Sequence, residues 1–96
     1  MSWWYVYVAR CADDSLYCGI ATDVAARIAA HDAGKGARYT RGRGPLTVVL
    51  TRRCRTKGGA LRIEYAIKQL TRPEKQELLR APRDRFDALA RKAMRG

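Results

Sequence analysis

Two stretches near the N-terminus have the alternating pattern that is typical of β-strands. Residues 3–10 alternate aromatic residues with valines, and residues 16–20 are a second short apolar run. The turn-forming sequence Asp13-Asp14-Ser15 lies between them, so the two strands are expected to form an antiparallel hairpin. A third strand is predicted over residues 46–51.

The length of the hairpin loop decides which tyrosines share a face, because side chains alternate along a strand with a period of two. A three-residue loop at 13–15 would place Cys11 opposite Tyr17. Tyr17 would then share a face with Tyr7 and Tyr5. An even-numbered loop would place Tyr17 on the opposite face. Only an odd loop, or an equivalent bulge, brings the tyrosines together.

A helical period of about 3.6 residues follows the hairpin. It predicts a helix that Thr22 or Asp23 caps and that runs to about Ala33, with Val24 and Ile28 on its apolar stripe. His31 falls close to that stripe and Arg27 falls beside it. Neither side chain is therefore expected to point into open solvent.

A second helix is predicted over residues 58–70, after a basic turn at residues 52–57. Glu64 falls near the inward face of this helix, where burial of a carboxylate is costly unless it is paired or bound to a metal. The inward stripe itself consists of Ala60, Ile63, Ile67 and Leu70.

Two more helices complete the predicted elements. One begins at the capping box of Thr71 and Glu74, and the other begins at Pro82. The order ββαβααα predicts an α+β fold in which a small three-stranded antiparallel sheet is flanked by helices. With 96 residues and no internal repeat, the chain is predicted to form one domain over residues 1–96.

The charge of the chain is strongly positive and unevenly distributed. The net charge is +11, and the whole excess lies after residue 40, where sixteen basic residues stand against five acidic ones. This favours nucleic acid as partner over a membrane, because most of the basic residues have no strongly apolar helix face behind them. A soluble basic surface without a binding role is the alternative. The glycine-rich loop at residues 34–45 carries the cations that we expect to contact phosphates: Lys35, Arg38, Arg41 and Arg43.

The three cysteines are Cys11, Cys18 and Cys54, and none belongs to a C-x-x-C pair. Their number and spacing argue against a disulfide framework and against a structural zinc site. We expect buried, reduced thiols. The N-terminal apolar stretch has no basic leader and is too short to span a membrane, so a cytoplasmic location, with nucleoid association as an option, is expected.

Several short motifs stand out when they are taken together with their spacing: V-Y-V at 6–8, L-Y-C-G-I-A-T-D-V at 16–24, Arg27, His31, G-K-G-A-R at 34–38 and R-I-E-Y-A-I-K at 62–68. Over about residues 3–80 the chain resembles the GIY-YIG nuclease superfamily, and in particular its small stand-alone bacterial members. Two departures are visible. Tyr5 stands where the first motif usually has glycine, and the chain contains no asparagine, which many members have near the site.

The resemblance implies a metal-dependent endonuclease that hydrolyses phosphodiester bonds. It assigns catalytic roles to Tyr7 and Tyr17, and it makes Arg27 the group that stabilises the extra negative charge on phosphorus. Glu64 would hold Mg²⁺ or Mn²⁺, and His31 matches the polar residue one turn after the arginine. One tyrosine would act as general base. Tyr7 assisted by His31 is the preferred assignment, although which tyrosine takes which role is left open.

The resemblance also suggests a substrate and a setting. DNA is favoured over RNA, cut with structure-directed or weak sequence specificity, in repair or recombination. A monomer without an obligate protein partner is expected. One alternative is a catalytically silent nucleic-acid-binding module of the same fold, in which Trp3, Trp4 and Tyr39 stack on unpaired bases. Another is a scaffold protein whose basic surface binds an acidic partner.

Overall fold

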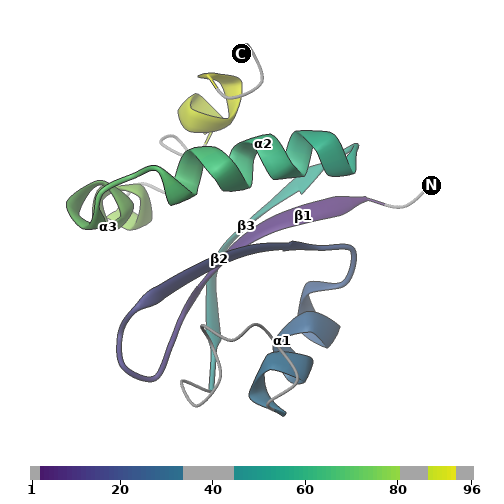
Figure 1. The fold of residues 1–96 in the computed structure, drawn as a ribbon, viewed down its shortest axis with the longest axis vertical. Helices are drawn as coiled ribbons and strands as arrows, with labels where there is room; N and C mark the ends of the chain where they lie inside the picture. The colour runs from purple at the N-terminus through teal and green to yellow at the C-terminus, as the bar shows by residue number, and fades with distance from the viewer. Residues whose placement is uncertain (1–2, 34–44, 81–86, 93–96) are drawn as a thin grey trace.

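A three-stranded antiparallel sheet forms the middle layer of the molecule (Figure 1). The computed structural model describes residues 3–33, 45–80 and 87–92. The strands are β1 (Trp4–Arg10), β2 (Leu16–Ala21) and β3 (Thr47–Cys54), in the spatial order β2-β1-β3. The predicted α+β class with a three-stranded antiparallel sheet is confirmed.

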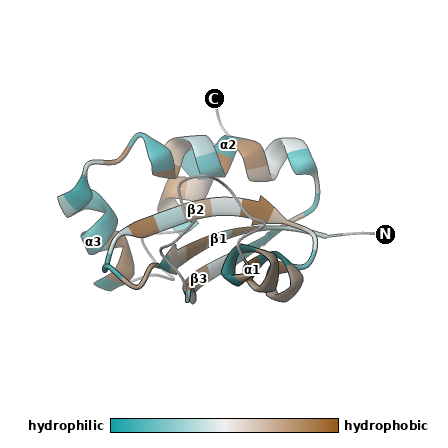
Figure 2. Ribbon diagram, turned by 60° about the horizontal axis from the view of Figure 1, so that its bottom comes forward, coloured by the Kyte–Doolittle hydropathy of each residue, from teal (hydrophilic) through white to brown (hydrophobic). Residues whose placement is uncertain are grey.

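Helices cover both faces of this sheet (Figures 1 and 2). The helix α1 (Val24–Asp32) lies on one face, which we call the α1 side. The helix α2 (Lys57–Lys68) lies on the other, the α2 side, together with α3 (Arg72–Arg80) and the helical residues 87–92.

The alternation of side chains along β1 produces two separate cores. Val6 and Val8 face α2, where they pack with the predicted inward stripe of that helix. Tyr7 and Ala9 face the opposite way and pack with residues of β2 and α1. The core residues on the α1 side are Tyr7, Ala9, Cys11, Ala21 and Leu46, with Tyr17, Val24 and Ile28 packed against them.

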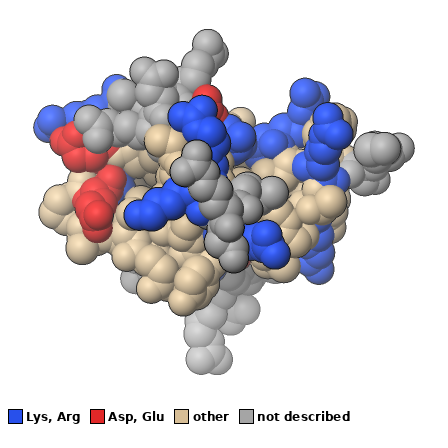
Figure 3. All heavy atoms as spheres, turned by 90° about the horizontal axis from the view of Figure 1, so that it is seen from above, with Lys and Arg blue, Asp and Glu red and all other residues tan. Residues whose placement is uncertain are grey.

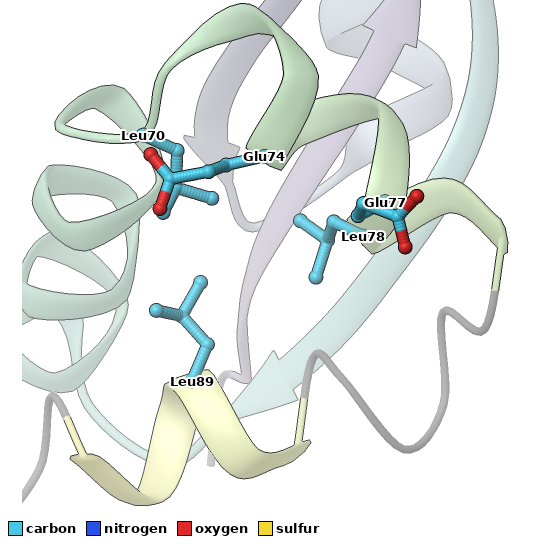
Figure 4. A pocket seen from close by; sticks show the side chains of 5 residues that line it. All are labelled: Leu70, Glu74, Glu77, Leu78 and Leu89. Carbon is cyan, nitrogen blue, oxygen red and sulfur yellow. The ribbon is translucent and has the colours of Figure 1, made fainter.

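The C-terminal helices extend the core on the α2 side. Figure 4 shows Leu89 pointing toward Leu70 and Leu78 across a cavity of about 260 Å³. The carboxylate of Glu74 accepts a hydrogen bond from the Thr71 amide at 2.8 Å, which is the predicted capping box. Glu77 forms an ion pair with Arg80 at 3.1 Å. Both acidic groups at this cavity therefore have structural roles.

The hairpin between β1 and β2 has a longer loop than expected. Ala9 faces Tyr17, so the connection comprises residues 11–15 and the expected pairing of Cys11 with Tyr17 is wrong by two residues. The Cys11 amide donates to the Ser15 carbonyl at 2.8 Å, and Asp14 adopts a left-handed conformation with φ of 68°. The shift is an even number of residues, so the tyrosines still share a face.

Two other element boundaries differ from the predictions. β3 continues to Cys54, through residues 52–54 that were expected to form a turn, because β1 extends far enough to pair Trp4 with Cys54. The helix α2 begins at Lys57, where Thr56 caps it. The predicted basic loop falls largely on residues 34–44, which lie outside the described residues, as does the predicted helix start at Pro82.

The three cysteines are buried and free, as predicted. Cys11 belongs to the core on the α1 side and Cys18 to the core on the α2 side, so the sheet separates the two thiols. Within residues 3–33, 45–80 and 87–92, no helix combines the length and the apolar character that crossing a bilayer requires.

The packing of Tyr7 over Gly19 gives a stability prediction. A Cβ at position 19 would lie 2.7 Å from the Tyr7 hydroxyl oxygen and 2.8 Å from Cζ, in a fully buried environment. We expect Gly19→Ala to lower the free energy of unfolding by about 1–3 kcal/mol, because the ring has to move. Thermal unfolding followed by circular dichroism measures this loss.

Gly58→Ala is the matched control, because a Cβ there meets nothing within 4 Å. Gly58 lies in the first turn of α2, where alanine raises helix propensity by up to about 1 kcal/mol. An unfolding temperature of Gly19→Ala equal to that of Gly58→Ala would contradict the packing argument.

Candidate active site

A buried hydrogen bond joins the sheet to α1. The hydroxyl of Tyr7 lies 3.3 Å from Nε2 of His31, and both residues are almost entirely buried, at 0% and 3% exposed. The position of His31 follows from the helix start. Asp23 directly after β2 caps α1 by accepting from the Ala26 amide at 3.0 Å, and His31 then lies about two turns further on.

Gly19 provides the room that this hydrogen bond needs. It pairs with Tyr7 across the β1–β2 ladder, and the Tyr7 ring lies directly over its backbone. Because a Cβ at this position would lie only 2.7 Å from the Tyr7 hydroxyl oxygen, a side chain here would displace the hydroxyl. The glycine of the second motif is therefore part of the geometry of the site.

Tyr17 completes a cluster of three rings, Tyr7, Tyr17 and His31, which we call the Tyr–His cluster. The Tyr17 ring meets His31 edge-on with a centroid separation of 5.2 Å, and its centroid lies 6.2 Å from that of Tyr7. Tyr17 is half-buried, whereas Tyr7 has no exposed surface. The structure thus brings together three of the predicted site residues, with Tyr17 at the surface and Tyr7 behind it.

Arg27 is the fourth predicted residue that acts on this cluster. Contrary to the prediction from the helical wheel, the residue is exposed, because the α1 stripe that packs on the sheet is narrow and consists of Val24 and Ile28. Its side chain nevertheless acts on the Tyr7 hydroxyl, both as a hydrogen-bond donor and as a positive charge. A guanidinium that is exposed and close to Tyr7 is well placed to meet an anion.

The burial of the cluster sets its protonation states. Burial raises the pKa of Tyr7 to about 12, Tyr17 adds to the rise, and Arg27 partly offsets it. Burial also lowers the pKa of His31, and the charge of Arg27 lowers it further, against an opposing effect of Asp32. At neutral pH, Tyr7 therefore keeps its proton and His31 is uncharged, so a ring nitrogen of His31 is available as an acceptor.

Glu64 lies on the other side of the sheet from the Tyr–His cluster. It belongs to α2, its carboxylate is 3.5 Å from Nζ of Lys68, and its charge acts on Cys18 of the core on the α2 side. That charge and, more strongly, burial raise the pKa of the Cys18 thiol to about 12. Among the ion pairs of the described residues, the partner of Glu64 is Lys68 of its own helix, not Arg27. Tyr17 and Cys18 are neighbours on the edge strand β2, so Glu64 lies near the same edge as Tyr17 but across the sheet.

Within the described part of the chain, the side chains of this region suit a metal ion that is bound through a single carboxylate. Among the described residues, no group of three His, Cys, Asp or Glu side chains converges. Mg²⁺ is commonly held by one or two carboxylates together with water and substrate phosphate, and Glu64 can supply one such carboxylate. The chain therefore fits a metal whose remaining ligands come from water and substrate.

Basic side chains spread over the molecular face seen from above, while acidic ones gather at the α3 end (Figure 3). Of the predicted phosphate contacts, Lys35, Arg38, Arg41 and Arg43 lie outside the described residues. Arg53, which was expected to lie in a turn, is in β3 opposite Tyr5. The alternation of side chains with a period of two would have placed Arg53 correctly if the predicted strand had been continued to residue 54.

Comparisons with known proteins identify the family of the chain. The GIY-YIG catalytic domain family matches residues 3–77. A UPF0213 protein of Cronobacter sakazakii is 49% identical over 79 residues, which are 82% of this chain and 83% of the relative. The UPF0213 protein YhbQ of Salmonella typhimurium is 48% identical over 89 residues, 93% of this chain and 88% of the relative.

A solved structure is similar as well. The solution NMR structure of a UPF0213 protein from Bacillus halodurans is 47% identical to the chain and superposes with a TM-score of 0.55, covering 82% of this chain and 84% of that one. The family match spans most of the chain and includes both tyrosines, Arg27, His31 and Glu64. The resemblance is confirmed, and the chain belongs to the GIY-YIG family.

Proposed function

We propose that this protein is a divalent-metal-dependent endonuclease that hydrolyses phosphodiester bonds in DNA. The observation that carries the proposal is the hydrogen bond between Tyr7 and His31 next to Tyr17 and Arg27. It combines a proton acceptor, hydroxyl groups and a cation within one small region. Hydrolysis of a phosphodiester needs these groups, because a water must lose a proton while negative charge builds on phosphorus.

The different exposure of the two tyrosines supports a division of roles. Tyr17 reaches the surface and would contact the attacking water or the phosphate, while Tyr7 is closed off behind it. This favours Tyr17 over Tyr7 as the tyrosine that meets the substrate, in contrast to the preference drawn from sequence. Tyr7 would donate a hydrogen bond to neutral His31 and so hold the imidazole in place as a proton acceptor behind Tyr17. Arg27 would stabilise the pentavalent phosphorus.

Glu64 would hold the metal, Mg²⁺ or Mn²⁺, as the carboxylate that the family motif matches. When bound, the ion would neutralise the phosphate and lower the pKa of a coordinated water. The protein's own contribution is to hold the Glu64 carboxylate 3.5 Å from Nζ of Lys68, in a side chain that is 17% exposed.

We further propose that the substrate is recognised through its phosphates, with structure-directed or weak sequence specificity. The excess of basic residues after residue 40 supports this, and Lys35, Arg38, Arg41 and Arg43 are the proposed phosphate contacts. The protein would act as a monomer in the cytoplasm, including on nucleoid DNA, in repair or recombination.

A second candidate function is a catalytically silent nucleic-acid-binding module. The observation that favours it is the position of Glu64, which pairs with Lys68 on the α2 side rather than with the Tyr–His cluster. Such a protein would bind nucleic acid through the same basic residues and would not cut it.

Cleavage assays separate the two functions. Labelled single-stranded, duplex and branched DNA is incubated with the protein and Mg²⁺ or Mn²⁺. We expect Tyr17→Phe and Glu64→Gln each to lower the cleavage rate by roughly a hundredfold or more, while DNA binding persists.

Tyr65→Phe and Glu77→Gln are the matched controls, because Tyr65 is 67% exposed on α2 and Glu77 forms an ion pair with Arg80. Both should cut like the wild type. Unchanged cutting by Glu64→Gln would refute the assigned metal ligand. Binding without any cutting by the wild-type protein would support the silent module.

The protonation state of His31 gives a second prediction. His31 is the only histidine of the chain, so its NMR signals identify it without assignment of the others. Burial and the charge of Arg27 lower the pKa of His31, so His31 should titrate below about 6.5. Cleavage should weaken as the pH falls through this lowered pKa. Arg27→Gln should move the midpoint of titration to higher pH, because a nearby positive charge is removed.

The stability of the fold should change with pH in the same direction as the cleavage rate, so it should decrease as the pH falls. A histidine whose folded-state pKa is lowered stabilises the fold fully above about pH 6.5 and loses that contribution as pH falls toward the folded-state value. A midpoint at or above 6.5 in the wild-type protein, or no upward movement in Arg27→Gln, would contradict the proposed electrostatics.

A further inference from the structure

Arg53 lies on the α1 side of the sheet, in line with the tyrosines. It faces Tyr5 across the β1–β3 ladder. Thr51, two residues earlier in β3, faces Tyr7. Tyr5 shares the face of Tyr7 because the two are separated by two residues. The guanidinium of Arg53 lies over the ring of Trp3, 4.1 Å from its centroid.

The two adjacent arginines of β3 have different environments. Arg52 points to the α2 side and forms an ion pair with Asp87. Arg53 points the opposite way and is exposed, and no carboxylate of the described residues forms an ion pair with it. Arg52 therefore ties β3 to the C-terminal helical residues, whereas the charge of Arg53 is left unneutralised by the part of the chain that the structure describes.

The contact with Trp3 holds Arg53 in place for a ligand. A guanidinium that stacks on an indole uses its flat face and keeps the N–H donors in its plane available for an oxyanion. Holding the long side chain before binding reduces the conformational entropy that binding would otherwise cost. Trp3 itself is half-buried, so the platform is fixed by the fold.

The distance between Arg53 and the Tyr–His cluster fits one nucleic-acid strand. Arg53 and Tyr7 are two residues and one strand apart, which places their backbone positions about 8 Å from each other, and Tyr17 lies one strand further on β2, opposite Ala9. Arg53 and Tyr17 are thus separate positions on one side of the sheet, so a strand that carries a charge on every phosphate can meet both.

We propose that Arg53, positioned by Trp3, binds a backbone phosphate of the substrate strand at a distance from the bond that is cut. The placement relative to the cut rests on the proposed nuclease function, whereas the phosphate contact itself does not. Nucleic acid would thus cross the α1 side of the sheet from the Tyr–His cluster toward the start of β1.

The test measures binding without cleavage. Fluorescein-labelled single-stranded and duplex oligonucleotides are titrated with protein in EDTA, at several salt concentrations, and anisotropy is recorded. Arg53→Ala should lower the affinity about tenfold at low salt and reduce the slope of log affinity against log salt by about 0.9 for duplex or about 0.7 for single strands.

Arg62→Ala is the matched control, because it removes the same charge from an exposed position of α2, on the other side of the sheet. It should leave the slope closer to that of the wild type. Equal slopes for Arg53→Ala and Arg62→Ala would overturn the proposal, since net charge alone would then explain the effect.

A double-mutant cycle tests the role of Trp3. If Trp3 acts through Arg53, Trp3→Ala should weaken binding in the wild-type background and have no further effect in the Arg53→Ala background. Trp3→Phe should restore most of the affinity, because phenylalanine still offers a ring face to the cation. An equal cost of Trp3→Ala in both backgrounds would overturn the positioning role.

Cleavage kinetics then distinguish this proposal from the nuclease function. Arg53→Ala should raise KM and leave kcat close to that of the wild type, whereas Tyr17→Phe should lower kcat. A wild-type protein that cuts nothing, but whose binding depends on Arg53 as above, would refute the nuclease function and leave the phosphate contact standing.

Discussion

The burial of β1 on both faces is the constraint on which the rest of the structure depends. As the central strand it pairs with β2 and β3, and consecutive side chains enter two different cores. Val6 and Val8 anchor α2, while Tyr7 packs under α1. A site residue is thus also a core residue, and a change at Tyr7 that removes the ring alters the chemistry and the packing of the α1 side together.

The polar groups of Tyr7 and His31 follow from that constraint. Burial of a hydroxyl and an imidazole is costly unless each finds a hydrogen-bond partner, and here each is the partner of the other. The same burial keeps the imidazole neutral and the hydroxyl protonated. The chemical properties of the cluster are therefore a product of its packing, and the exposed Arg27 acts on it from the surface.

The sequence was sufficient for the local part of the fold and of the site. An odd loop was the condition for Tyr7 and Tyr17 to share a face, and the observed loop at residues 11–15 meets it although it is two residues longer than expected. Asp23, one of the two predicted caps, begins α1 and so positions His31. The exposure of Arg27 and the length of β3 were missed, because they depend on how elements pack and pair over long separations. The wheel of α2 indicated that Glu64 turns inward but not which face of the sheet α2 covers.

The odd length of the hairpin loop has a consequence for how such chains can vary. Insertion or deletion of two residues in the loop at 11–15 would leave Tyr17 on the α1 side, whereas a change of one residue would exchange its place with that of Cys18. The edge strand would then present a thiol to His31 and a phenol to the core beneath α2. Loop lengths that differ by an odd number should therefore be rare among related chains, unless a β-bulge restores the register.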